Sequence, residues 1–98
     1  MSGETEASWS PWMDFDRTNV VAVPELSGVY MMHAGMKILY IGAGENIRQK
    51  LLESLSDPCI GKAKRFRYIA TQSPDKVKEQ LLKEYLGKHG RLPECMEK

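Results

Sequence analysis

The hydrophobic and polar positions of the chain follow two periods, one typical of strands and one typical of helices. Residues 65–71 alternate between two faces, and this period of two predicts a strand. Residues 28–33 and 37–41 predict two more strands, which residues 34–36 join as a hairpin. The segment Gly42-Ala43-Gly44 is expected to break the second strand of that hairpin.

Two other segments repeat their apolar residues at helical spacing. Residues 45–55 carry an apolar residue at every fourth position from Ile47, which predicts a helix with one buried stripe. Residues 74–89 predict a longer helix with clear boundaries. Ser73 is expected to cap its start, a proline occupies its first position, and Gly90 ends it.

The N-terminal part of the chain divides in two. Residues 1–8 have little to bury, so we expect a disordered leader. Residues 9–24 are rich in aromatic side chains, and we expect this segment to pack on the domain formed by residues 25–98. Within the segment, Asp16 is expected to cap a short helix over residues 17–23, which a proline ends.

The predicted order of elements is therefore hairpin, helix, strand, helix. A sheet with an apolar face must bury that face against other elements. We expect a single α+β domain with a small three-stranded antiparallel sheet flanked by helices. The length of 98 residues fits one domain with one modest core.

Composition and charge narrow the class of protein only slightly. The chain is 42% hydrophobic and 28% charged, which is ordinary for a globular domain. No apolar run approaches the roughly 20 residues that span a bilayer, and the N-terminus lacks the features of a signal peptide. We therefore expect no membrane association and a cytoplasmic location. Residues 1–27 carry a net charge of −4 and residues 28–98 carry +5, so the body is basic enough to permit nucleic-acid contact.

The two cysteines, Cys59 and Cys95, are too few for a disulfide framework. In a reducing cytoplasm we expect both to be free thiols. A zinc site would need two further ligands. His33 and His89 do not lie at zinc-finger spacing from a cysteine, so we expect no zinc site.

Two short motifs ten residues apart are the most informative part of the sequence. Gly28-Val29-Tyr30 opens one predicted strand, and Tyr40-Ile41-Gly42 closes the next. A tyrosine in a strand commonly packs on a half-buried face, and that structural role remains open for both residues. The complete string, which continues with Asn46 and a helix, resembles the start of the GIY-YIG nuclease superfamily.

The resemblance implies a metal-dependent phosphodiesterase site. In that superfamily both tyrosines project into one site, and the first helps to position or activate the attacking water. Tyr30 and Tyr40 are therefore candidate catalytic residues, since a phenol can join a proton relay once its pKa falls from about 10. Gly42 is expected to let the backbone turn sharply into the following helix.

Four positions after the second motif bear on that chemistry. Where the superfamily usually has threonine, asparagine, arginine and histidine, this chain has Gly44, Asn46, Lys50 and Ser54. Lysine offers a point charge where a guanidinium forks onto two phosphate oxygens, so Lys50 is a weaker candidate catalytic cation. Ser54 cannot supply the proton transfer or the charge of an imidazole. Asn46, like Gly42, remains a candidate nucleic-acid-binding residue.

The resemblance also implies a metal ligand in the long helix, a glutamate three residues before an apolar pair. With Leu81-Leu82 as that pair, the equivalent residue is Lys78, and an ammonium group would oppose a magnesium ion. Glu79 is adjacent and would be the ligand if the helix register differed by one residue. The implied cofactor is therefore none if the site is eroded, and magnesium or manganese if it is active.

A cluster of four cationic residues is a further candidate for nucleic-acid binding: Lys62, Lys64, Arg65 and Arg67. The alternative is a solvated strand edge on which charge prevents edge-to-edge pairing. If Lys50 and Lys78 face one groove, that groove is cationic and can hold phosphate by charge without cutting it.

Three hypotheses follow from these features. The first is a GIY-YIG-like domain with an eroded catalytic site that binds nucleic-acid phosphates as an accessory module, and the sequence leans toward this non-enzymatic role. The second is an active endonuclease that depends on magnesium or manganese and uses Lys50 and Glu79 in altered roles. The third is a protein-interaction module in which Trp9, Trp12 and Phe15 form an anchor patch.

Overall fold

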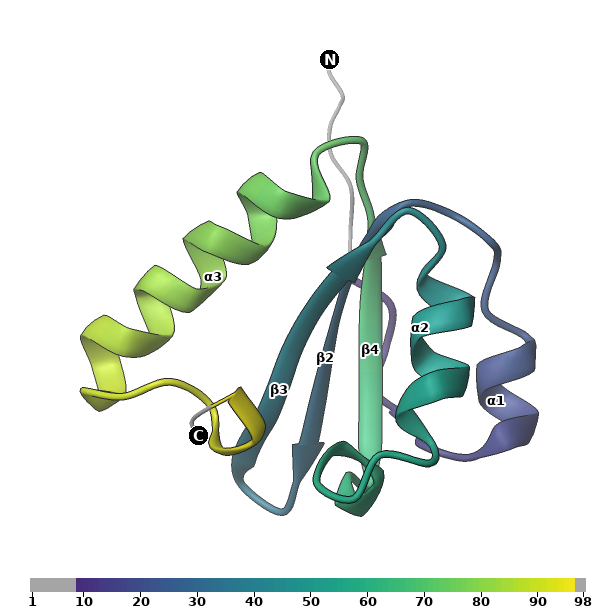
Figure 1. The fold of residues 1–98 in the computed structure, drawn as a ribbon, viewed down its shortest axis with the longest axis horizontal. Coiled ribbons are helices and arrows are strands. Elements are labelled where there is room, and N and C mark those ends of the chain that lie inside the picture. Colours follow the sequence, from purple (N-terminus) through teal and green to yellow (C-terminus); the bar gives the residue numbers. More distant parts are fainter. Residues whose placement is uncertain (1–8, 97–98) are drawn as a thin grey trace.

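The computed structural model describes residues 9–96, which form an α+β structure around one antiparallel sheet (Figure 1). In chain order the elements are β1 (Met13–Asp14), α1 (Arg17–Val21), β2 (Gly28–Ala34), β3 (Lys37–Gly44), α2 (Ile47–Ser54), η1 (Ile60–Lys62), β4 (Arg65–Ala70), α3 (Pro74–His89) and η2 (Glu94–Met96). Helices α1 and α2 lie on one side of the sheet and α3 lies on the other (Figure 1). The expected disordered leader, residues 1–8, lies outside the described residues. No helix within residues 9–96 is long and apolar enough to cross a membrane.

The sheet has four strands in the order β1-β4-β2-β3, so the expected number of three is wrong. The additional strand is β1, which pairs antiparallel with Phe66 and Arg65 of β4. Because β1 has only two residues, it carries no alternation that a sequence pattern could reveal. It covers one end of the outer edge of β4, at Arg65 and Phe66.

The larger part of the core lies between the sheet and the two helices α1 and α2. This α2-side core contains ten buried residues: Val20, Val23, Tyr30, Met32, Leu39, Ile47, Leu51, Ile60, Ala63 and Phe66. The predicted stripe of α2 is confirmed at Ile47 and Leu51, both fully buried. Leu55, the third residue of that stripe, is only half-buried, and Ser54 is buried instead. Full burial of such apolar side chains contributes about 1.5–3 kcal/mol each.

The opposite face of the sheet carries a smaller core. This α3-side core has three buried residues, Val29, Met31 and Ile41, and half-buried side chains pack around them. The predicted boundaries of α3 are confirmed, with Gly90 ending the helix at a φ of 74°. Ser73 lies at the N-cap position, but its side chain makes no capping hydrogen bond, so the expected cap is wrong. Although every residue of α3 is described, none of them is buried. The helix therefore lies on its face of the sheet without being enclosed there.

The hairpin of β2 and β3 contains a change of register that affects the site. Met32 pairs with Tyr40 and His33 pairs with Ile38, so Leu39 is an additional residue on β3. Such a bulge turns neighbouring side chains to one face. Leu39 and Tyr40 both pack in the α2-side core, where strict alternation would have separated them.

The short helix α1 begins as predicted. Asp16 caps it, and its side-chain oxygen accepts a hydrogen bond from the backbone N–H of Asn19 at 2.9 Å. The helix ends at Val21, two residues earlier than predicted. Val20 and Val23 are both buried, which fixes the N-terminal segment on α2.

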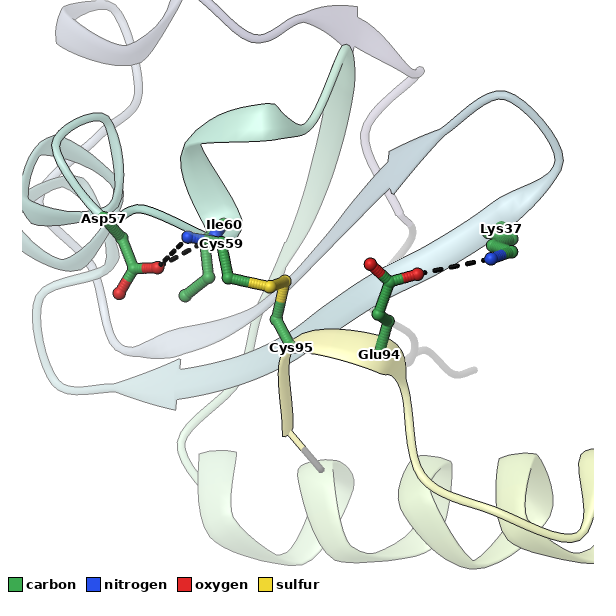
Figure 2. Close-up of a disulfide and its surroundings, with 6 residues drawn as sticks. All are labelled: Lys37, Asp57, Cys59, Ile60, Glu94 and Cys95. Carbon is green, nitrogen blue, oxygen red and sulfur yellow. Dashed lines mark hydrogen bonds and ion pairs between the residues drawn. A yellow bond between two sulfur atoms is a disulfide. The ribbon is translucent and has the colours of Figure 1, made fainter. Parts of the chain in front are cut away.

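A disulfide joins Cys59 and Cys95, so the expectation of two free thiols is wrong (Figure 2). The residues lie 36 positions apart in the chain, but their Cα atoms are 5.7 Å apart, within the usual range for a disulfide. They meet because the chain after α3 returns to the sheet and packs on β3. That return is a tertiary event, which cysteine spacing in the sequence does not reveal.

The returning tail contacts both cores. Cys95 packs against the α2-side core, whereas Met96 packs against the α3-side core. An ion pair between Lys37 Nζ and Glu94 Oε1, 3.2 Å long, also attaches the tail to β3 (Figure 2). Since β3 is the last strand of the sheet, η2 covers an edge that would otherwise be open.

Candidate functional site

Tyr30 and Tyr40 lie on the same face of the sheet, toward α2. Tyr30 pairs with Gly42 and Tyr40 pairs with Met32, so the two rings lie diagonally across neighbouring strands. The ring centroids are 6.0 Å apart, and the ring planes are tilted by 36°. The structure thus brings together the two tyrosines that the sequence motifs single out.

Gly42 lies directly beneath both rings. A Cβ atom at this position would overlap the Tyr30 phenol and come within 2.7 Å of Tyr40 Cε2. Gly42 is part of β3, and among the described glycines a positive φ occurs at Gly35 and Gly90. The expected role of Gly42 in a sharp turn is therefore wrong. Glycine is required because two tyrosine rings occupy the space that a side chain would need.

The two tyrosines line a hollow of about 180 Å³, here called the tyrosine pocket. Its other lining residues are Lys50, Glu53, Ser54, Asp57 and Ile60. Residues 50, 53, 54 and 57 recur at intervals of three and four, which places them on one side of α2 and of the turn that follows. The pocket therefore combines one ammonium group, two carboxylates and three hydroxyls.

The phenol of Tyr30 is buried and held in its protonated form. Burial raises the pKa of Tyr30 above its ordinary value of 10.0, and the nearby Tyr40 and Glu53 raise it further. A hydrogen bond with Ser54 lowers this pKa without reversing the shift. At neutral pH the Tyr30 hydroxyl can therefore donate a hydrogen bond, but it cannot accept a proton as a base.

Ser54 takes part in this arrangement through its own hydroxyl. Its Oγ donates a hydrogen bond to the backbone carbonyl of Lys50 at 2.8 Å, one turn earlier in α2. The side chain is 5% exposed, so it lies inside the pocket wall. Ser54 therefore contacts Tyr30 at the position where the resemblance implies a histidine, and it supplies a neutral hydroxyl there.

Lys50 extends over the end of β3. A Cβ atom on Gly44 would come within 3.1 Å of Lys50 Cγ, so the lysine stem lies against the glycine. This contact brings the cationic side chain to the tyrosine pocket. Gly44, which stands where the superfamily has threonine, thus leaves room for the lysine.

The charges and hydrogen bonds of the tyrosine pocket disfavour a divalent cation. Within residues 9–96, no group of three or more His, Cys, Asp or Glu side chains could hold a metal ion. Of the two pocket carboxylates, Asp57 uses Oδ1 to accept the backbone N–H groups of Cys59 and Ile60 at 2.8 and 2.9 Å (Figure 2). Glu53 accepts a hydrogen bond from Gln49 at 3.2 Å. The ammonium of Lys50 shares the pocket and would repel a metal ion.

Lys78 and Glu79, the candidate positions for a metal ligand, belong to α3. Lys78 is half-buried and Glu79 is exposed. The apolar side of the same helix packs on the α3-side core, on the other face of the sheet from the tyrosines. Among the described residues that line the tyrosine pocket, none comes from α3.

Asn46 and Arg48 have structural contacts at the start of α2. Asn46 caps the helix, because its side-chain oxygen accepts a hydrogen bond from the N–H of Gln49 at 3.1 Å. Arg48 Nε donates to the carbonyl of Val23 at 2.7 Å, and the guanidinium lies 3.8 Å from Glu25. Asn46 Nδ2 also donates to Glu25 Oε2 at 3.3 Å, so both residues connect α2 to the segment before β2.

The four residues of the predicted cationic cluster lie in different environments. Lys62 ends η1 and Lys64 precedes β4, and both are exposed. Arg65 is exposed and pairs with Asp14 of β1 across 3.5 Å. Arg67 is half-buried, so it differs from the other three.

Arg67 lies between two indole rings. Its guanidinium carbon is 4.7 Å from the ring centroid of Trp9 and 4.6 Å from that of Trp12, both within cation–π range. Burial lowers the pKa of this guanidinium below its ordinary value. Trp12 also stacks on His33 at 4.1 Å, while Phe15 packs edge-on against Phe66 on the other face. The aromatic rings of the N-terminal segment thus contact the domain itself.

Sequence reasoning missed two residues of the tyrosine pocket, Glu53 and Asp57. A signal was present for Glu53, which follows Lys50 by three residues along the predicted helix, whereas Asp57 lies beyond the end of that helix. That spacing places polar groups on the side of α2 that faces the tyrosines. The motif positions named above include Lys50 and Ser54 but neither of these two residues.

The fold and the paired tyrosines define a GIY-YIG-like domain. Residues 8–88 match the family described as Domain of unknown function (DUF7508), and the chain belongs to that family. None of the curated proteins matches the chain in sequence.

The likeness to solved structures confirms the GIY-YIG-like fold. The GIY-YIG N-terminal endonuclease domain of UvrC from Thermotoga maritima, bound to magnesium, matches with a TM-score of 0.60 and 21% identity, covering 81% of this chain and 92% of that one. A tyrosine point mutant of the same domain, bound to its catalytic divalent cation, also matches with a TM-score of 0.60 and 21% identity, over 81% and 91% of the two chains. At this identity the likeness establishes the fold of the present chain.

Proposed function

We propose that this chain is a GIY-YIG-like domain with an eroded catalytic site, which binds nucleic-acid phosphates as an accessory module without cutting them. The main support for this proposal comes from the charged side chains that line the tyrosine pocket. Lys50 puts an ammonium group in the lining of the pocket, and the carboxylates of Glu53 and Asp57 already accept hydrogen bonds from the chain, so this set of groups disfavours a divalent cation.

The protonated phenol of Tyr30 supports the same conclusion. A tyrosine that activates water must give up or relay its proton near neutral pH. Burial and the neighbouring Tyr40 and Glu53 raise the Tyr30 pKa, which moves it away from that range. Held in its protonated form, the hydroxyl does not supply the base that such a mechanism needs.

Cations at and near the pocket supply the attraction for phosphate. Lys50 lines the pocket, and the exposed Lys62 and Lys64 follow its lining residue Ile60 in the chain. Glu53 and Asp57 oppose an anion and limit the affinity. With about three phosphate contacts, the logarithm of the binding constant for duplex DNA should fall with the logarithm of salt concentration with a slope of about −2 to −3.

The test is a binding and cleavage assay with labelled single-stranded, duplex and branched DNA and RNA. Each substrate is incubated with EDTA, magnesium or manganese, and with wild-type protein or the Tyr40→Phe variant. We expect duplex or branched substrate to be shifted in all three conditions and to remain uncut. Metal-dependent cutting that disappears in Tyr40→Phe would overturn the proposal.

Two charge reversals with the same change in net charge locate the contact. Lys50→Glu alters the tyrosine pocket, whereas Lys83→Glu alters an exposed position on α3 that lines none of the described hollows. Lys50→Glu should weaken duplex binding by about tenfold, and Lys83→Glu by less than about threefold. If the two variants lost the same amount of duplex affinity, binding would reflect general attraction between charges. The tyrosine pocket would then not be the binding site.

An active endonuclease is the second candidate. Magnesium commonly binds through one or two carboxylates together with substrate phosphates, and Glu53 and Asp57 are two carboxylates beside the paired tyrosines. The same assay separates the two candidates. If cutting is observed, Glu53→Gln should abolish it, while Glu79→Gln tests the alternative position on α3.

A further inference from the structure

A large hollow lies on the other face of the sheet from the tyrosines. Figure 1 shows α3 diverging from the sheet toward its C-terminal end. A hollow of about 450 Å³ lies there, and a second of about 270 Å³ adjoins it. Both are lined by Ile38, Tyr85 and His89, so together they form a continuous depression, here called the α3 groove.

An aromatic pair lies at the junction of the two hollows. The rings of Tyr85 and His89, one turn apart on α3, have centroids 4.2 Å apart and a tilt of 34°. The floor beneath them is apolar, with Met31, Ile38 and Ile41 from the sheet. A planar ring above an apolar floor is the surface on which a nucleic-acid base stacks.

Cationic groups stand at both ends of the groove. Arg91 lines the larger hollow, while Lys88 and Arg67 line the smaller one. Glu84 opposes them in the smaller hollow, and Glu94 in the larger hollow is paired with Lys37. Across the two hollows four cationic side chains thus face two carboxylates, an excess that favours an anionic ligand.

The wall beside the larger hollow is fixed by the covalent and ionic contacts of the tail. Glu94 is part of η2, and the next residue, Cys95, is bonded to Cys59 (Figure 2). The ion pair of Glu94 with Lys37 joins the same wall to β3 (Figure 2). One side of the groove is therefore the tail, which the disulfide and the ion pair attach to the domain. The other side is α3, a helix that has no buried residues.

We propose that the α3 groove binds a segment of single-stranded nucleic acid, with a base stacked on the Tyr85–His89 pair and phosphates near Arg91 and Lys88. The ligand class is that of the proposed function, but the site is different and uses neither the tyrosine pocket nor a metal ion. Single strands are favoured over duplexes because the bases of a duplex are already stacked and cannot reach the aromatic pair.

Arg67 and the two tryptophans extend this surface beyond the smaller hollow. Within residues 9–96 the Nε of Arg67 has no hydrogen-bond partner, although its guanidinium is covered by both indoles. Arg67 also lines the smaller hollow and adds positive charge at this end of the groove. Since the chain has only two tryptophans, both here, their fluorescence reports on binding at this place.

The experiment measures fluorescence anisotropy of labelled oligothymidine and oligouridine of about 12 nucleotides with the full chain in EDTA. Three charge reversals are compared: Lys88→Glu in the groove, Lys83→Glu on the same helix outside it, and Lys50→Glu in the tyrosine pocket. Lys88→Glu should weaken binding about tenfold, and each of the other two by less than about threefold. Tyr85→Ala should also weaken binding about tenfold, whereas Leu86→Ala, an exposed truncation on the same helix, should have little effect.

Four outcomes would overturn the groove proposal. Equal losses for Lys88→Glu and Lys83→Glu would show attraction between charges without a site. Loss with Lys50→Glu alone would overturn the groove and leave the proposed function standing. If the protein bound duplexes but not single strands, the groove proposal would also fall and the proposed function would stand. If it bound no nucleic acid at all, both proposals would fall. The tryptophan signal supports the groove if its change on titration is lost in Lys88→Glu and kept in Lys50→Glu.

Discussion

The two faces of one sheet are built in different ways. On the α2 side, two helices enclose ten buried residues and leave a small pocket between the tyrosines. On the α3 side, three residues are buried, and the covering helix has none of its own. Neighbouring residues of β2, such as Tyr30 and Met31, belong to opposite faces because strand side chains alternate. The closely packed face holds the motif residues rigidly, and the open face leaves room for a ligand.

The largest expected effect comes from truncating one leucine on each face and comparing the two losses of stability. Leu51 on α2 is fully buried, so Leu51→Ala should lower the free energy of unfolding by about 2–5 kcal/mol. Leu82 on α3 is only half-buried, so Leu82→Ala should cost less than about half as much. Urea unfolding followed by circular dichroism measures both values. Equal costs would contradict the view that the α3 side is loosely covered.

The disulfide is the covalent link to a tail that touches both faces. Closing a loop of 36 residues should stabilise the fold by about 2–4 kcal/mol, chiefly by restricting the unfolded chain. Reduction with dithiothreitol should lower the unfolding midpoint and speed hydrogen exchange at the edge strand β3, which η2 covers. A variant with serine at both positions should already show these properties and should not respond to the reductant.

Replacing a glycine with alanine should change the free energy of unfolding in opposite directions on the two faces of the sheet. Gly42→Ala would force a methyl group into the Tyr30 ring and should destabilise the fold by about 1–3 kcal/mol. Gly87 lies within α3, and a methyl group added there would meet no atom of another element within 4 Å. Gly87→Ala should therefore stabilise the fold by about 0.5–1 kcal/mol. Thermal unfolding of both variants provides the measurement, and destabilisation by Gly87→Ala would indicate that the α3 side is closely packed.

The buried phenol of Tyr30 should make the stability of the fold depend on pH in the alkaline range, and this effect is smaller than those above. Since the pKa of Tyr30 is raised in the folded state, its contribution to stability is complete below about pH 10 and is lost as pH rises further. The loss should reach at most about 1.4 kcal/mol per pH unit above that value. Tyr30→Phe should remove this part of the pH dependence, measured as the difference in urea midpoint between the two proteins. An unchanged dependence in Tyr30→Phe would contradict the assignment.

The sequence predicted most of the elements because their signals are local. The cap at Asp16, the helix start at Pro74 and the helix end at Gly90 each depend on a few neighbouring residues. The tyrosine motifs predicted a shared site, and the two rings face one pocket. The expected break of the second strand at residues 42–44 is wrong, because β3 continues to Gly44 and pairs there with β2. That continuation, the β1 strand and the disulfide were not predicted, because each depends on residues distant in the chain.

The sequence by itself determined the order of the elements and the two tyrosine motifs, since periodicity, capping and short motifs act over a few residues. Only the tertiary structure decided that Gly42 makes room for two rings, that Glu53 and Asp57 join Lys50 in the pocket, and that the candidate metal position lies on α3 outside it. It also created the α3 groove, whose lining comes from the hairpin, from α3 and from the tail. The physical reason is that packing brings together side chains from separate segments, and no local pattern encodes how far one helix diverges from a sheet.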